Sequence, residues 1–279
     1  MPDPAYALLA SLIWAFSPVY YRGFLKKFDF LQLNLMRTSM SAVVLAAPAI
    51  LLGFGAGLEY SILSGVITLA VGDSLFLLSI GEMGASIATP VAYTYVLFVQ
   101  LTATTVGENV PTANFLAALM VIVGVFLVSR GGGTKPRARG VALAVAGALV
   151  WTVGQDLIRV ATNAGGSAVG VAFGRVIAAS VALFAAALVT GRVKAWPRGF
   201  TRREYCFLAL VAVSDLAVGS LLYVYSISLV GVAVTVILTS LSPLLTQILS
   251  KALGKESPSR LDYSGGALIV AAVVLAVIL

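Results

Sequence analysis

The sequence predicts an all-α integral membrane protein with ten transmembrane helices, arranged as two inverted repeats of five helices each. Three observations lead to this fold class: 60% of the 279 residues are hydrophobic, only 10% are charged, and the second half of the chain repeats the first. The mean hydropathy is +1.03, whereas roughly a quarter of the residues in a soluble domain are charged. The composition therefore excludes a pair of soluble domains, and lipid or other apolar helices must surround most of the chain.

Ten apolar segments follow one another along the chain. Most approach the roughly 20 residues that an α-helix needs to cross the hydrocarbon of a bilayer, and runs of this length are not the strands of a membrane barrel. The fifth and tenth segments are shorter and are expected to stand more upright. A window of about 19 residues places the segments at 5–21, 31–52, 61–80, 85–105, 115–129, 141–159, 168–189, 205–227, 232–250 and 264–279.

The basic residues fall on one side of such a ten-helix arrangement. The loops near residues 22–29, 130–140, 191–204 and 251–260 share that side, and they hold nearly all of the 18 Lys and Arg residues behind the net charge of +7. By the positive-inside rule this side is cytoplasmic, and both termini lie outside a multi-pass protein of the cell membrane. Basic residues placed between apolar runs indicate membrane orientation, and we expect no nucleic-acid partner.

An internal repeat relates the two halves of the chain. A shift of 147 residues pairs "LAVGDSLFLLS" at 69–79 with "LAVGSLLYVYS" at 216–226. Shifts of 137 and 138 residues pair the tryptophans and arginines of the earlier spans, namely Trp14 with Trp151 and Arg37 with Arg175. Colinear matches over five spans indicate a duplication.

The duplication also fixes the relative orientation of the halves. Since each half has an odd number of spans, the two halves must cross the membrane in opposite directions. Inverted repeats of this kind recur in secondary transporters, whose substrate site lies near the midplane between the repeats. We expect one five-helix domain at 1–130, a basic linker at 131–140 and a second five-helix domain at 141–279.

The ends of the two halves carry a resemblance to a known family. The segments "TVGENVPTANFLAALMVIVGVFLVS" and "TSLSPLLTQILSKALGKESPSRLDYSGGALIVAAVVLAVIL" resemble the EamA domain of the drug/metabolite transporter superfamily, as do the Gly107-Glu108 pair, the Leu-Ser-Pro-Leu at 241–244 and the early Trp14. The resemblance covers the whole chain as two tandem domains and implies a transporter. It also implies that both termini are cytoplasmic, whereas the loop charges predict the reverse, and we follow the charges.

Several charged side chains lie inside the apolar spans. An ionised group at the membrane midplane is costly, so it is expected to face a cavity or a partner. Asp73 and Asp215 lie near the middle of their spans and are candidates for ion coupling, although they could instead bond to neighbouring hydroxyls or backbone. Arg37 and Arg175 are candidates for substrate contact, or their long side chains could extend to the membrane surface.

Asp156 and Arg159 also lie inside a span, three residues apart. This spacing puts both on one face of a helix, where they are expected to neutralise each other.

Uncharged polar and aromatic residues complete the set of candidates for a cavity. The glutamines could instead join helices to one another, the tryptophans could pack or anchor at the membrane surface, and alternating tyrosines cannot all face one cavity. Tyr93, Tyr95, Tyr223 and Tyr225 are therefore weaker candidates, and of these four only Tyr93 is kept for the site. The candidates for the cavity are Trp14, Ser17, Tyr93, Gln100, Trp151, Gln155, Ser240 and Gln247.

These features predict a secondary active transporter that works by alternating access. Arginines and aromatic rings suit a small metabolite such as an amino acid or a related carboxylate, and an intramembrane aspartate suits coupling to protons, with exchange as the other possibility. The expected partners are this substrate and the lipid bilayer. The oligomeric state stays open, with a monomer compatible with the pattern.

Two other functions compete with transport. One is an intramembrane aspartyl protease, which "VGD" at 71–73 suggests faintly, and the other is a scaffold or channel that does not transport. The chain contains no histidine, which excludes Ser-His catalysis and His-ligated metal sites. We therefore expect no enzymatic activity, no catalytic residues, no metal and no cofactor.

Overall fold

The computed structural model describes residues 4–131, 137–192, 200–253 and 260–278. Over these ranges every regular element is a helix, and extended backbone pairs only in an isolated bridge between Gly55 and Gly166. The expected all-α class is confirmed for this part of the chain. Residues 132–136 of the expected linker lie outside the described residues, and so do four of the basic loop residues, namely Lys135, Lys194, Arg198 and Lys255.

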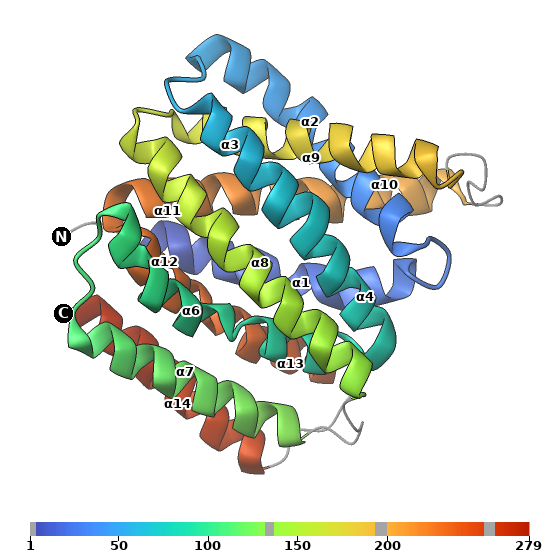
Figure 1. Cartoon of the computed structure of the whole chain (residues 1–279). Helices are drawn as coiled ribbons and strands as arrows, with labels where there is room; N and C mark the ends of the chain where they lie inside the picture. Colours follow the sequence, from blue (N-terminus) through green and yellow to red (C-terminus); the bar gives the residue numbers. More distant parts are fainter. Residues whose placement is uncertain (1–3, 132–136, 193–199, 254–259, 279) are drawn as a thin grey trace.

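The first half consists of five long helical units, and two of these are made of several elements joined end to end (Figure 1). The elements are α1 (Ala5–Phe24), α2 (Phe30–Leu52), α3 (Leu58–Ser64), the π-helix η1 (Gly65–Gly72), α4 (Asp73–Met83), α5 (Ala85–Ala92), α6 (Tyr95–Thr102), the 3₁₀-helix η2 (Ala103–Val106) and α7 (Thr112–Gly131).

The second half repeats this order of helical units, including a π-helix in the middle of its third unit, although no element described there corresponds to η2. The elements are α8 (Ala138–Asn163), α9 (Ala168–Val189), α10 (Arg202–Ala212), the π-helix η3 (Val213–Gly219), α11 (Ser220–Val230), α12 (Val232–Thr239), α13 (Leu241–Ala252) and α14 (Arg260–Ile278).

Seven helical segments in the described ranges are long and apolar enough to cross a membrane. They are Phe30–Leu52, Leu58–Met83, Ala85–Val106, Ala138–Asn163, Ala168–Val189, Arg202–Val230 and Val232–Leu249. Shorter apolar stretches occupy α7 and α14, and large apolar side chains such as Val43, Val181 and Leu210 are exposed on the outside of the bundle. An apolar outer surface around long helices is what lipid requires, so the chain is a multi-pass membrane protein.

Local sequence signals set where several helices begin. Asp29 starts α2 with a capping box, in which its carboxylate accepts from the backbone N–H groups of Leu31 and Gln32 at 2.8 and 3.2 Å. Gly84 and Gly231 make the tight turns before α5 and α12, with φ of 84° and 87°. Only glycine adopts this conformation without strain, which is why these antiparallel helices connect through one residue.

The two halves contact each other in a reciprocal pattern. Helix α1 packs against η3 and α11 of the second half, and α8 packs against η1 and α4 of the first. Helix α2 packs against its counterpart α9, and α7 lies along its counterpart α14 (Figure 1). The first helix of each half thus contacts the third unit of the other half, and such reciprocal contacts indicate that an approximate two-fold axis relates the halves. The duplicated halves are thus built into one bundle and not into two separate domains.

One helical unit in each half is broken at the same place. Helix α5 ends at Ala92 and α6 starts at Tyr95, while α12 ends at Thr239 and α13 starts at Leu241, positions that the 147-residue shift relates closely. Pro90 lacks the N–H that would bond to the carbonyl of Ser86, and the Gln247 side chain donates to that carbonyl at 3.4 Å. A side chain from the other half thus satisfies the freed acceptor.

Charged side chains at one end of the bundle pair with one another. Lys27 at the α1–α2 turn contacts Glu204 at the start of α10, and Arg192 contacts Asp29 at 2.9 Å. Arg137 also reaches Glu82, at 3.4 Å. Figure 1 shows this end opposite the end at which both chain termini lie. Lys27, Arg137 and Arg192, which belong to the basic loops, therefore lie at one end, as the loop charges predict.

Candidate functional site

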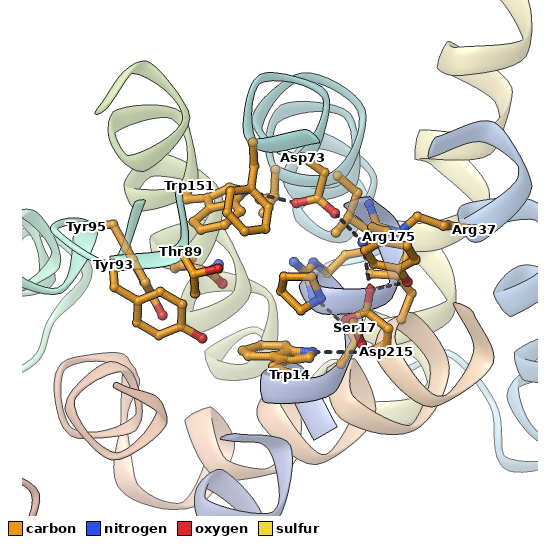
Figure 2. A pocket seen from close by; sticks show the side chains of 18 residues that line it. Trp14, Ser17, Arg37, Asp73, Thr89, Tyr93, Tyr95, Trp151, Arg175 and Asp215 are labelled. Atoms are coloured by element: carbon orange, nitrogen blue, oxygen red, sulfur yellow. Dashed lines mark hydrogen bonds and ion pairs between the residues drawn. The ribbon is translucent and has the colours of Figure 1, made fainter. Parts of the chain in front are cut away.

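A cavity of about 80 Å³ lies between the two halves of the bundle. Both halves contribute to its wall, the first half through α1, α2, η1, α4, α5 and α6 and the second through α8, α9, η3 and α11. The polar and aromatic side chains in the wall are Trp14, Ser17, Tyr21, Arg37, Thr68, Asp73, Phe76, Thr89, Tyr93, Tyr95, Trp151, Gln155, Arg175, Asp215 and Ser220. Figure 2 shows Tyr93 and Tyr95 on one side of this space and the arginines and aspartates on the other.

Arg37 lies at the centre of a buried ionic cluster. Its Nη2 donates to Oδ2 of Asp215 at 2.7 Å and to Oδ2 of Asp73 at 3.2 Å. Its Nη1 donates to Oδ1 of Asn34 at 3.2 Å. The Tyr21 ring stacks on the guanidinium, with 4.3 Å between the ring centre and Cζ, and its hydroxyl donates to Oδ2 of Asp215 at 2.7 Å. A buried guanidinium needs such partners, because desolvation costs several kcal/mol.

Repeat-related tryptophans join this cluster from the first helix of each half. The indole N–H of Trp151 donates to Oδ1 of Asp73 at 3.0 Å, and that of Trp14 donates to the backbone carbonyl of Asp215 at 3.1 Å. Each indole lies on a glycine of the other half, because a Cβ at Gly72 would meet Trp151 at 2.5 Å and one at Gly219 would meet Trp14 at 2.7 Å. The glycines therefore let the indoles approach closely.

Both acids lie at π-helical turns. Asp73 follows η1, and its backbone N–H bonds to the carbonyl of Thr68, five residues earlier, while Asp215 lies within η3. A π turn adds a residue to the helical turn and changes the direction of the following side chains, and such turns are frequent at functional sites. The acids of the two halves thereby reach the same guanidinium although they are not equivalent in the repeat.

Arg175 has a different environment from Arg37. Its Nε donates to Ser64 at 3.1 Å and its Nη1 to Ser220 at 2.8 Å. Within the described ranges it forms no ion pair with a carboxylate. It is 2% exposed, and Arg37 is 4% exposed. Neither side chain reaches the membrane surface, so the interpretation that these arginines extend outward is wrong.

Four buried polar atoms in the cavity wall lack a hydrogen-bond partner among the residues that the structure describes. They are Oγ1 of Thr68, Oγ1 of Thr89, Oε1 of Gln155 and Nε of Arg37. Buried polar groups are usually paired with protein or water, and an unpaired one costs about 1–3 kcal/mol. Gathered around one cavity, these atoms are suited to bind a polar molecule within it.

Nine of the twelve residues expected at a site lie in this cavity wall, namely Trp14, Ser17, Arg37, Asp73, Tyr93, Trp151, Gln155, Arg175 and Asp215. The other three lie elsewhere. Gln100 donates to the carbonyl of Ala233 at 2.9 Å, and Gln247 donates to that of Ser86 at 3.4 Å. Ser240 donates to the carbonyl of Ile237 at the break between α12 and α13. The glutamines therefore join helices of the two halves, which was the alternative to a place in the cavity.

The low rank that the sequence gives to Tyr95 needs a correction. Tyr93 and Tyr95 both line the cavity, although two residues of an intact helix at this spacing point in different directions. The break between α5 and α6 removes the conflict, because Tyr93 lies at the end of one helix and Tyr95 starts the next. The equivalent rings differ: Tyr223 is buried against Trp14, and Tyr225 stacks on Tyr6 near the surface.

Sequence reasoning also missed wall residues that it had the means to find. Ser220 and Thr68 are the repeat counterparts of Asp73 and Asp215, so the repeat itself points to them. Tyr21 lies one turn beyond Ser17 on the same face of α1. Thr89 carries no comparable signal.

A second polar cluster lies away from the cavity. The carboxylate of Glu108 accepts from the backbone N–H groups of Val232 and Ala233 at 2.5 and 3.0 Å, which caps α12. Arg159 approaches the same carboxylate at 2.9 Å and donates to the carbonyl of Ile227 at 3.1 Å. The expected pairing of Arg159 with Asp156 is therefore wrong, because the acid that it meets comes from the other half.

The described residues hold no group of three His, Cys, Asp or Glu side chains that could bind a metal ion.

Comparison with known proteins agrees with the repeat. The EamA-like transporter family matches the chain twice, over residues 4–130 and 138–278. An "Uncharacterized transporter" from Archaeoglobus fulgidus is 25% identical over 154 residues, which cover 53% of this chain and 55% of that protein. The chain thus matches about half the length of this curated relative. A solved structure titled "Crystal structure of protein" has a TM-score of 0.80 at 18% identity, covering 99% of this chain and 95% of the other.

Proposed function

We propose, from the premise that this chain belongs to the EamA-like transporter family, that it is a secondary active transporter of a small metabolite. In this proposal the two halves rock against each other and expose the central cavity to each side of the membrane in turn. The observation that carries the proposal is the cavity itself. It lies between the halves and both halves form its wall, which includes Thr68, Thr89 and Gln155, each with a polar atom that has no partner among the described residues.

The proposed transmembrane arrangement has ten spans in a five-plus-five inverted repeat. Seven spans are the long apolar segments, and α1, α7 and α14 supply the other three. The duplicated order of elements and the reciprocal contacts between halves support this count. The end that carries Lys27, Arg137 and Arg192 is proposed to face the cytoplasm of a cell membrane, with both termini outside.

The charged wall supports a substrate with a carboxylate, such as an amino acid or a related metabolite. Guanidinium groups bind carboxylates in a planar, paired geometry, and the aromatic rings suit an apolar body. Asp73 and Asp215 are the proposed coupling groups, acting through protons or in an exchange of substrates. Because both acids bond to Arg37, a proton on either one weakens that cluster and alters the contact between the halves.

Uptake into liposomes tests transport directly. The purified protein would be reconstituted and supplied with labelled amino acids and organic acids, with and without a pH gradient. Gln155→Leu removes an unpaired acceptor from the cavity and is expected to lower uptake at least about tenfold. Val153→Ala changes an exposed residue of the same helix and should leave uptake unchanged. Equal uptake with protein-free liposomes across the panel would reject the proposal.

The cluster geometry favours transport over the enzymatic alternative. An aspartic protease needs two carboxylates that share a proton, whereas here Oδ2 of Asp73 and Oδ2 of Asp215 both accept from Nη2 of Arg37. A scaffold or channel would leave the unpaired cavity atoms without a use, and the flux experiment separates these alternatives from a carrier by saturation with substrate.

A further inference from the structure

The two repeat-related arginines differ in whether their charge is balanced. Arg37 contacts two carboxylates, whereas Arg175 contacts only the hydroxyls of Ser64 and Ser220 in the described part of the chain. Both guanidinium groups are buried. A buried cation is stable when an anion lies beside it, so Arg175 can gain far more from an incoming anion than Arg37 can.

The repeat shows which carboxylates Arg175 lacks. The 147-residue shift relates Asp73 to Ser220 and Asp215 to Thr68. Arg175 does bond to Ser220, at 2.8 Å, just as Arg37 bonds to Asp73. The counterpart of the closer acid is Thr68, whose Oγ1 is buried without a partner in the cavity wall. Where the protein itself supplies a carboxylate to Arg37, the repeat gives the shorter, neutral side chain of Thr68, which lines the same cavity as Arg175.

The formal charges in the cavity wall balance in total but not around each arginine. The cluster of Asp73, Asp215 and Arg37 has one more carboxylate than guanidinium, which leaves it with a surplus negative charge. Arg175 adds one positive charge and forms no ion pair with an acid in the described ranges. The four charges of the wall therefore sum to zero, with the surplus negative charge on the Asp73–Arg37–Asp215 cluster and the surplus positive charge on Arg175. A molecule complementary to this wall is neutral in total and carries both charges.

We infer that the cavity selects zwitterions, with Arg175 and Thr68 receiving the carboxylate and the Asp73–Arg37–Asp215 cluster receiving the cationic group. This inference rests on the proposed transporter function. It makes Arg175 the anion anchor, although Arg37 is its equivalent in the repeat. Aromatic rings of Trp14, Trp151 and Tyr95 also line the cavity and can stack on a cationic group or cover an apolar body.

Binding of matched ligands to the purified full-length protein tests the inference without transport. Each set consists of an amino acid, the amine that lacks its carboxylate and the acid that lacks its amino group. Suitable sets are leucine with isopentylamine and 4-methylpentanoate, and phenylalanine with phenethylamine and 3-phenylpropionate. Calorimetry and thermal shift would measure binding. In at least one set the zwitterion is expected to bind about 30-fold or more tightly than either partner, because each partner leaves one buried centre unpaired.

Two substitutions should change the preferred charge in opposite directions. Arg175→Gln removes the positive centre, so the amine is expected to bind at least as well as the amino acid. Asp73→Asn removes the surplus negative charge, so the deaminated acid is expected to gain relative to the amino acid. Arg175→Lys keeps the charge and should keep the preference for the zwitterion, and Val153→Ala on the outer surface serves as the matched control.

The outcomes separate this inference from the transporter proposal. A preference for the zwitterion that reverses in both variants supports the inference, even if liposomes show no flux, in which case only the transporter proposal fails. Three results would overturn it: no binding in either set, tighter binding of an amine or acid to the unmodified protein, or an unchanged preference in folded Arg175→Gln protein. The last result would assign the anion to a different residue whether or not the protein transports.

Discussion

Arg37 and Arg175 come from the same position of a duplicated sequence, and their surroundings differ at nearly every neighbouring position. Around Arg37 the chain supplies Tyr21, Asn34, Asp73 and Asp215, which all contact the guanidinium or its partners. The counterparts of these four residues by the shifts of 137, 138 and 147 are Ile158, Ala172, Ser220 and Thr68. One arginine has an ionic cluster around it, and the other has neutral side chains.

The framework around these arginines shows no such difference. Trp14 and Trp151 lie on Gly219 and Gly72, which are themselves repeat mates. Gln100 bonds to the carbonyl of Ala233 and Gln247 to that of Ser86, and residues 86 and 233 are also related by 147. Close packing between halves depends on shape, which both halves share. Binding one polar ligand between two halves requires unlike groups, so the differences concentrate in the cavity.

The largest expected effect on stability separates the two arginines. Arg37→Gln leaves the carboxylates of Asp73 and Asp215 buried without a counter-ion, and it is expected to cost about 3–5 kcal/mol of unfolding free energy. Arg175→Gln leaves only the serine hydroxyls behind, and it should cost no more than about 1–2 kcal/mol. Thermal unfolding of both variants in the same detergent measures the difference.

A triple variant provides the control for this prediction. Adding Asp73→Asn and Asp215→Asn to Arg37→Gln removes the unpaired charges, so part of the lost stability should return. A triple variant less stable than Arg37→Gln alone would mean that charge balance is not what holds the cluster together.

A smaller effect is expected to separate the two acids. Asp215 has the shorter bond to Arg37, at 2.7 Å, and accepts a further bond from Tyr21, whereas Asp73 lies 3.2 Å from Arg37 and accepts from Trp151. Asp215→Asn should therefore destabilise the protein by about 2–3 kcal/mol and Asp73→Asn by about 1–2 kcal/mol. Equal melting temperatures for the two variants would contradict this order.

The sequence predicts the framework of this molecule better than its site. The 147-residue repeat and the loop charges are properties of the chain alone, and they lead to a helical bundle made of two related halves. They also lead to nine of the residues in the cavity wall, because polar groups in an apolar span must face a cavity or a partner.

The pairings within the site follow from features that residue patterns do not encode. Asp73 and Asp215 reach Arg37 because both lie at π turns, and a π turn leaves no clear mark in the hydrophobic pattern. Tyr93 and Tyr95 share the cavity because a helix breaks between them, three residues after Pro90 on the chain. Arg159 meets Glu108 across the two halves, and a spacing rule within one helix cannot predict such a contact.

The matched glycines should respond equally to substitution. Gly72→Ala and Gly219→Ala each place a methyl group where an indole now lies, at 2.5 and 2.7 Å from the nearest ring atom. Each should cost about 1–2 kcal/mol, because the ring must move and its N–H loses alignment with the other half. Tryptophan fluorescence and thermal unfolding check this. Gly81→Ala is the matched control in the same helical unit, since a Cβ there meets nothing within 4 Å.

The smallest effects are expected at the glutamines that link the halves. Gln100→Leu and Gln247→Leu each remove one side-chain bond to a backbone carbonyl, and polar contacts between membrane helices contribute about 0.6 kcal/mol on average. The losses should differ slightly. Pro90 leaves the carbonyl of Ser86 without a helical partner, whereas Ile237, four residues after Ala233 in α12, has an N–H to donate to the carbonyl of Ala233. Gln247→Leu is therefore expected to lower the melting temperature more than Gln100→Leu. Gln100 lies 2.9 Å from the carbonyl of Ala233, whereas Gln247 lies 3.4 Å from that of Ser86. The opposite order of melting temperatures would show that this shorter bond matters more than the acceptor that Pro90 leaves free.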